Sequence, residues 1–188
     1  SEETADVFKK GAEKFYDEAR LVAAFNGNPS IVSVYDFFYE NDTVYYTMEY
    51  LEGTTLKDYV DKNGVITAGQ AVLVAERISS ALMTAHSSNI LHRDISPDNI
   101  MICNDGKIKL LDFGAARQVV ANASQSLSVI LKQGFAPLEQ YQKKGRQGPW
   151  TDIYSLGATL YYAMTKDIPD DPMTRFESDD EYSSNKYS

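Results

Sequence analysis

The stretch HRDISPDN (residues 92–99), followed by the triplet DFG (residues 112–114), decides how this chain is interpreted. Within it, Asn99 follows Asp94 by five residues, and Asp112 follows Asn99 by thirteen. A carboxylate can take a proton from a hydroxyl, and oxygen atoms of carboxylates and amides are suitable ligands for Mg²⁺. The spacing therefore predicts a base at Asp94 beside two oxygen ligands for Mg²⁺, Asn99 and Asp112.

The composition is that of a globular protein, and it excludes some classes of partner. The chain has 188 residues, enough for one domain with a sizeable core or for two small lobes. Its net charge of −9 argues against nucleic acid and against an anionic membrane surface as partners. Cys103 is the only cysteine, so no intrachain disulfide is expected and a cytoplasmic location is favoured. No apolar run reaches the roughly 20 residues that span a bilayer, so this segment is expected to make no membrane contact.

Hydrophobic periodicity and capping residues predict helices and short strands along the chain. The expected helices lie at about residues 4–25, 55–61, 67–86 and 151–164. The expected strands lie at residues 31–38, 43–49, 99–103 and 107–111, the first two forming a hairpin, and residues 51–53 read as a linker. The predicted core residues are Val72, Ala75, Ile78 and Leu82 in the helix at 67–86, and Tyr154, Leu156, Leu160 and Tyr161 in the helix at 151–164.

Several further motifs flank the two loops in a definite order. They are FYDEAR (residues 15–20), MEYLEG (48–53), GFAPLEQY (134–141) and TDIYSLG (151–157). With these motifs, the chain resembles the bacterial eukaryotic-like Ser/Thr protein kinases from about residue 8 to about residue 172. The resemblance implies an α+β fold, in which a partial small lobe with a helix and a β-hairpin lies over a mainly helical, truncated large lobe. It also implies that ATP binds between the lobes.

The resemblance assigns a role to each residue of the predicted site. Asp94 accepts or orients the proton of a hydroxyl on a protein substrate. Asn99 and Asp112 hold Mg²⁺, which neutralises charge on the transferring phosphoryl group. These roles make the chain an ATP-dependent Ser/Thr protein kinase by family.

The resemblance also places the nucleotide against the hinge between the lobes. Backbone groups of Glu49 and Leu51 would meet the adenine, with Met48 at the back of the pocket and Met101 as its floor. Each methionine equally fits an ordinary core position. Glu18 is the expected ion-pair partner of an ATP-binding lysine.

Scaffold contacts follow from the resemblance as well. His92 is expected to pack under Phe113, with Val22 and Val34 continuing that stack toward the small lobe. Asp152 is expected to tie the backbone of the catalytic loop. His92 is not expected to bind a metal, and His86 has no ligand partner nearby in sequence.

Two positions depart from the family pattern, and the residue at one supplies the kind of side chain that is missing at the other. The pattern places a lysine two residues after the catalytic Asp, where this chain has Ser96. It places a threonine near the end of the loop, where this chain has Lys132. Our hypothesis is that Lys132 reaches back beside Asp94 and Ser96 and supplies the missing cation. The alternative is a solvated loop lysine.

A third departure concerns what the sequence lacks. No Gly-rich phosphate loop precedes residue 15, and no strand carries the ATP-binding lysine. We therefore expect a partial small lobe at residues 1–50, a partial large lobe at 51–165 and an acidic loop or disordered tail at 166–188. A chain truncated at both ends would be nearly inactive alone, and its exposed apolar surfaces would favour a homodimer.

Two alternative functions remain open at this point. A pseudokinase or binding module is favoured by Ser96 and by the missing lysine, whereas the intact Asp94, Asn99 and Asp112 argue against it. A small-molecule kinase of the same fold is the other alternative. The GFAPLEQY segment (residues 134–141) argues against that one, because it resembles the substrate-docking segment of protein kinases.

Overall fold

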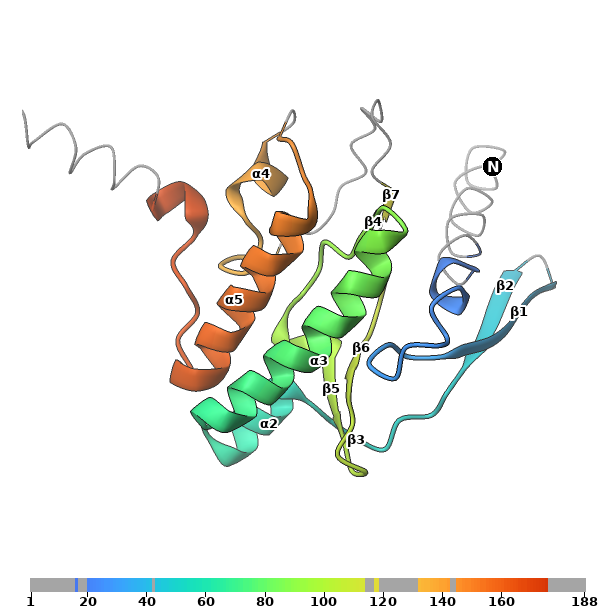
Figure 1. Cartoon of the computed structure of the whole chain (residues 1–188), viewed down its shortest axis with the longest axis horizontal. Helices are drawn as coiled ribbons and strands as arrows, with labels where there is room; N and C mark the ends of the chain where they lie inside the picture. The colour runs from blue at the N-terminus through green and yellow to red at the C-terminus, as the bar shows by residue number, and fades with distance from the viewer. Residues whose placement is uncertain are drawn as a thin grey trace, which may run out of the picture.

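The computed structural model describes residues 16, 20–41, 43–113, 117–118, 132–142 and 145–175. Its helices are α2 (Leu56–Asn63), α3 (Ala68–Ser87), the 3₁₀ turn η1 (Pro97–Asn99), α4 (Leu138–Tyr141) and α5 (Pro149–Thr165). Its strands are β1 (Val34–Glu40), β2 (Thr43–Met48), β3 (Gly53–Thr55), β4 (Ile90–Leu91), β5 (Ile100–Cys103), β6 (Ile108–Leu110) and β7 (Arg117–Gln118). The β1–β2 hairpin lies at one side of the molecule and α2, α3 and α5 at the other, with β5 and β6 between them (Figure 1). This arrangement confirms the expected α+β fold.

The hairpin forms as the sequence predicts, although its first strand begins later. β1 pairs antiparallel with β2, from Val34 opposite Met48 to Glu40 opposite Thr43. Residues 30–32 run along β6 instead: the N–H of Leu110 donates to the carbonyl of Ser30 at 2.8 Å, and the N–H of Val32 donates to the carbonyl of Leu110 at 3.2 Å. Because these hydrogen bonds go to β6, the segment cannot pair with β2, and it joins the hairpin to the rest of the core.

The predicted linker at residues 51–53 is partly wrong, because Gly53 begins strand β3. β3 pairs antiparallel with β5, with Gly53 opposite Cys103 and Thr55 opposite Met101. A Cβ at Gly53 would lie 2.1 Å from the carbonyl oxygen of Ile102, so only glycine allows this close approach. The chain that leaves the hinge is therefore bound at once to the strand that carries Met101.

Helices α2 and α3 begin within one residue of the predicted starts, and a threonine caps each of them. The Thr55 hydroxyl accepts a hydrogen bond from the N–H of Asp58 at 3.0 Å. Thr67 and Gln70 form a reciprocal capping box, which satisfies two of the free N–H groups at the start of α3. Gly64, with φ of +86°, ends α2 in a conformation that favours glycine.

The predicted core faces are only partly correct. In α3, Ile78 and Leu82 are buried, but Val72 is 66% exposed; the buried residues are Ala71, Val74, Ile78, Ala81, Leu82 and Ala85. The buried stripe is wider than predicted because α3 packs against α5 on one side and β6 on the other (Figure 1). In α5, Leu156 is buried, but Tyr161 is 49% exposed and Tyr162 is buried in its place.

The ends of the predicted elements differ in two more places. The first helix includes residues 20–23 and ends at Ala23, two residues earlier than predicted; most of its predicted length lies outside the described residues. Residues 172–175 form one helical turn within the predicted tail, of which residues 176–188 are not described. Among the residues that the structure describes, no helix has both the length and the apolar character needed to cross a membrane.

Candidate active site

The backbone of the predicted catalytic loop is held by the fully buried carboxylate of Asp152, from α5. Its oxygens accept hydrogen bonds from the N–H of His92 at 2.9 Å and from the N–H of Arg93 at 2.7 Å, and His86 Nε2 lies 2.7 Å away. Burial opposes ionisation of Asp152, but these hydrogen bonds outweigh it and hold the pKa of the carboxyl below its usual value. Arg93 has φ of +66°, so Asp152 stabilises a backbone conformation that non-glycine residues rarely adopt. The expected tie between Asp152 and this loop is confirmed.

We expect Asp152→Ala to lower the free energy of unfolding by about 3–5 kcal/mol, because it leaves a buried hydrogen-bonded group without its partner. Chemical denaturation of the variant and the wild type measures the loss. Asp105→Ala is the matched control, since Asp105 is an exposed carboxylate that pairs with the exposed Lys107 and should change stability little. Equal losses in both variants would contradict a structural role specific to Asp152.

Asp94 and Asn99 lie side by side at the end of this loop. The turn η1 carries Asn99, whose Nδ2 donates to the main-chain carbonyl of Asp94 at 2.8 Å and to Asp94 Oδ2 at 2.8 Å. The amide oxygen is then the atom of Asn99 that remains for a cation. Burial raises the pKa of Asp94 above its ordinary value, and the charge of Lys132 and the hydrogen bond from Asn99 partly oppose this rise.

Lys132 lies against the catalytic loop, 36 residues along the chain from Ser96. Its Nζ donates to Ser96 Oγ at 2.7 Å and lies 3.6 Å from Asp94 Oδ1 and 3.6 Å from Asp98 Oδ2. The alternative of a solvated loop lysine does not describe this position, since the side chain is only 33% exposed. The structure thus brings Asp94, Ser96 and Lys132 together, and what they do in catalysis stays a prediction.

Lys132 is held in place by the turn that follows it. The N–H groups of Phe135 and Ala136 both donate to the Lys132 carbonyl, at 3.0 and 3.1 Å. The Phe135 ring is buried against Tyr162 of α5, with 6.0 Å between ring centroids. Gly134, with φ of +81°, supplies the left-handed residue of the turn. A buried aromatic side chain therefore fixes the backbone from which the Lys132 side chain extends.

The segment that carries Asp112 is bound to the catalytic loop by the main chain of Leu111. The N–H of Leu111 donates to the carbonyl of Asn99 at 2.9 Å, and its carbonyl accepts from His92 Nε2 at 2.9 Å. Because a carbonyl can only accept, Nε2 carries the proton of His92. Burial lowers the pKa of His92, which keeps the ring neutral. The two predicted metal ligands, Asn99 and Asp112, are thus joined through one residue.

Phe113 lies between two rings, as was partly predicted. Its ring centroid is 4.6 Å from that of His92 and 5.7 Å from that of Phe25. The contact with His92 confirms the expected packing, and Val22 and Val34 are buried in the same core. The contact with Phe25 was missed, because the sequence places Phe25 at the end of a helix with no sign of what it meets.

Asn99 and Asp112 offer oxygen donors, which are the ligands that Mg²⁺ prefers. Within the described part of the chain, no group of three or more His, Cys, Asp or Glu side chains could hold a metal ion. Mg²⁺ usually keeps several waters and is held by one or two carboxylates together with substrate phosphates. The oxygen donors of Asp112 and Asn99 are therefore of the kind that would hold Mg²⁺ together with nucleotide phosphates, and this role stays a prediction.

The hinge residues lie between the hairpin and β3. Among the described residues, neither the carbonyl of Glu49 nor the N–H of Leu51 makes a main-chain hydrogen bond, and both residues line the same open pocket. Met48 is 39% exposed, so the interpretation of this residue as ordinary core is wrong, and Met101 is half-buried. Glu18, the remaining predicted residue of the nucleotide site, lies outside the described residues.

Two polar residues of the site were missed by the sequence analysis. Asp98 is the second carboxylate beside Lys132. Gln140 Nε2, from α4, donates to the carbonyl of Arg93 at 3.0 Å and joins the GFAPLEQY segment to the catalytic loop. The position of Asp98, two residues after Ser96, was an available signal, whereas no local pattern indicates the long-range contact of Gln140.

Comparison with known proteins agrees with this geometry. The chain matches the family described as protein kinase domain over residues 2–185. It is 37% identical over 158 residues to the serine/threonine-protein kinase PrkC of Bacillus subtilis (strain 168), a match that covers 84% of this chain and 24% of that protein. It is 35% identical over 156 residues to the serine/threonine-protein kinase PknL of Mycobacterium tuberculosis (strain ATCC 25618 / H37Rv), covering 83% of this chain and 39% of that protein.

A solved structure, the PpkA-294 apo form, is similar to the fold described above. Its TM-score is 0.76 at 38% sequence identity, and the match covers 95% of this chain and 63% of that chain. The chain spans 24% of the length of PrkC and 39% of that of PknL. Since the family match extends over nearly the whole chain, this chain belongs to the protein kinase domain family.

Proposed function

We propose that this chain is the catalytic region of a Ser/Thr protein kinase, which transfers the γ-phosphate of ATP to a hydroxyl of a protein substrate. The observation that carries the proposal is the cluster of Asp94, Ser96 and Lys132, in which a carboxylate base lies 3.6 Å from a cation. A base for the hydroxyl and a cation for the transferring phosphoryl group are the two charges that this reaction needs from side chains.

In the proposed reaction, the substrate hydroxyl oxygen forms a bond with the γ-phosphorus of ATP while the bond to the leaving oxygen of ADP breaks. Asp94 orients the hydroxyl and takes its proton. Lys132 stabilises the negative charge on the transferring group. Mg²⁺, when bound by Asn99 and Asp112, supplies further charge neutralisation of the phosphates.

The nucleotide is proposed to bind with its adenine at the hinge. The carbonyl of Glu49 and the N–H of Leu51 support this, because they are an acceptor and a donor two residues apart that make no main-chain hydrogen bond among the described residues. Met48 and Met101 would line the pocket, and Glu18 would pair with the ATP-binding lysine. The lobe boundaries near residues 50 and 165 belong to the same proposal.

Two observations favour a protein kinase over the alternatives. The cation beside Asp94 supports catalysis over a pseudokinase or binding module, which needs no cation at this position. The hydrogen bond from Gln140 to Arg93 supports a protein substrate over a small molecule, because it couples the substrate-docking segment to the catalytic loop. A cytoplasmic location agrees with the single buried Cys103, and a homodimer through exposed apolar residues such as Trp150 and Met83 remains a prediction.

The test is phosphate transfer by the full-length protein that contains this chain. With labelled ATP and Mg²⁺, we expect label in protein or peptide Ser/Thr hydroxyls and none in choline or aminoglycosides. Removal of Mg²⁺ with a chelator should abolish the transfer, and adding the ion back should restore it. Transfer to the small molecules alone would replace the proposal by the small-molecule kinase, and no transfer with intact folding would favour the pseudokinase.

A further inference from the structure

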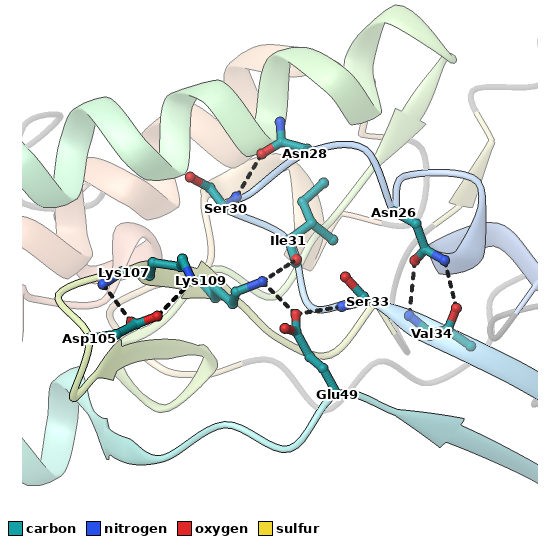
Figure 2. Close-up of polar contacts among 10 residues, drawn as sticks. All are labelled: Asn26, Asn28, Ser30, Ile31, Ser33, Val34, Glu49, Asp105, Lys107 and Lys109. Carbon is teal, nitrogen blue, oxygen red and sulfur yellow. Dashed lines mark hydrogen bonds and ion pairs between the residues drawn. The ribbon is translucent and has the colours of Figure 1, made fainter.

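A buried ion pair links the hinge to the strand that precedes Asp112. Lys109, in β6, is only 5% exposed. Its Nζ lies 2.5 Å from Glu49 Oε1 and donates to the carbonyl of Ile31 at 3.2 Å (Figure 2). Lysine is rarely buried unless it is paired, because desolvation of the charge is costly. Lys107, two residues earlier in the chain, is exposed and pairs with Asp105.

Glu49 is held by three hydrogen bonds, two to its side chain and one from its backbone N–H. Its Oε1 accepts the N–H of Ser33 at 2.7 Å as well as the ammonium of Lys109, and its own N–H donates to the carbonyl of Ser33 at 2.9 Å. Burial opposes ionisation of Glu49, but the hydrogen bonds from Lys109 and Ser33 hold the pKa of the carboxyl below its usual value. Glu49 is therefore charged, and its backbone and side chain are both fixed against residue 33.

The location of this pair gives it a consequence for the nucleotide site. Glu49 is the first hinge residue, and its carbonyl is one of the groups proposed to meet the adenine. Lys109 lies three residues before Asp112, on strand β6. In the same strand, the main chain of Leu110 donates a hydrogen bond to residue 30 and accepts one from residue 32. One ammonium group thus connects the adenine end of the site with the strand that leads to a metal ligand.

We propose that Lys109 is a positioning residue for the nucleotide site: through Glu49 and Ile31 it fixes the hinge backbone relative to strand β6, which precedes Asp112. This inference rests on the proposed function, because it assumes that ATP binds at the hinge. In this proposal Lys109 does not contact ATP or the reacting atoms, and it acts through the backbone of residues 49–51. A purely structural ion pair would stabilise the fold without changing the affinity for ATP.

The test compares Lys109→Met with Lys107→Met in the full-length protein. Methionine keeps most of the length and apolar character of the lysine stem but removes the charge. We expect Lys109→Met to raise the Kd and the KM for ATP about tenfold, because a displaced binding group loses its alignment, with a smaller fall in kcat. Lys107→Met should leave both constants unchanged. A folded Lys109→Met protein with wild-type affinity for ATP would overturn the proposal, even if its thermal stability fell.

Glu49→Gln keeps the test decisive if Lys109→Met does not fold. The carboxamide has nearly the same shape and retains an acceptor for Ser33, so the fold is preserved while the ion pair is lost. We expect the same rise in the Kd for ATP from Glu49→Gln alone. Where Lys109→Met folds, we expect it to add little in the Glu49→Gln background. Wild-type affinity in Glu49→Gln, or additive effects in the double variant, would overturn the proposal.

Amide exchange separates failure of this inference from failure of the proposed function. Lys109→Met should speed hydrogen exchange at the amides of residues 49–51 relative to Lys107→Met, in the absence of nucleotide. If the wild type binds no ATP, the proposed function fails whatever the exchange shows. If the wild type binds ATP but the exchange and the affinity are the same in both variants, the function stands and the role of Lys109 fails.

Discussion

Asp94→Asn is expected to lower kcat by about 10²–10⁴-fold, the usual contribution of a positioned general base. Asparagine has nearly the same shape as aspartate but cannot take the proton of the substrate hydroxyl. The variant should keep its architecture, because Asn99 Nδ2 also donates to the main-chain carbonyl of Asp94, which the substitution leaves intact. We therefore expect the Kd for ATP to change little while the rate of phosphate transfer falls, as measured with labelled ATP in the full-length protein.

Asp98→Asn is the matched control for this experiment. It removes a carboxylate that lies at the same 3.6 Å from Lys132 but makes no hydrogen bond with Asn99. We expect a loss of less than about tenfold, because a partly exposed ion pair contributes only roughly 0.2–1 kcal/mol. Comparable losses in the two variants would show that the charge around Lys132 matters and that Asp94 is not a base.

The sequence predicted best what lies close together in the chain. Asp94 and Asn99 are five residues apart, and a single short turn is enough to bring them into contact. The capping threonines Thr55 and Thr67 act within the first turn of their own helices. In these cases the local spacing determines the geometry, and little depends on the rest of the fold.

Contacts between distant segments were predicted only where a family pattern supplied the missing geometry. Lys132 and Ser96 are 36 residues apart, and the hypothesis that they meet came from two substitutions in one pattern. Lys109 and Glu49 are 60 residues apart, and no sequence pattern indicated that they form an ion pair. In sequence, Lys109 is a polar residue between Ile108 and Leu110, which normally indicates a strand position that faces water. Its burial depends on the segment at residues 30–33, which covers β6 only in the folded chain.

Lys132→Met is expected to lower kcat by about 10²–10³-fold, the loss that follows removal of one well-placed electrostatic group. The fold should persist, because Phe135 and not Lys132 anchors the turn. The pH dependence should change as well. Burial already raises the pKa of Asp94, and the charge of Lys132 opposes that rise. Without the cation the pKa of Asp94 goes up further, so the acidic limb of kcat/KM, below which Asp94 is protonated and inactive, should move to higher pH.

Exchanging the side chains at positions 96 and 132 tests whether the cation of Lys132 has the same function as the lysine that the family pattern places at position 96. Lys132→Thr combined with Ser96→Lys restores the arrangement of the wider family, and the two side chains already meet at 2.7 Å, so the swap keeps their contact. We expect Ser96→Lys alone to be impaired, because Ser96 is fully buried and a second cation would be crowded against Lys132. The double variant should then be at least about tenfold more active than Lys132→Thr, a strong non-additivity that only interacting sites produce. Full activity of Lys132→Met, or additive losses in the double variant, would mean that the cation beside Asp94 has no part in phosphate transfer.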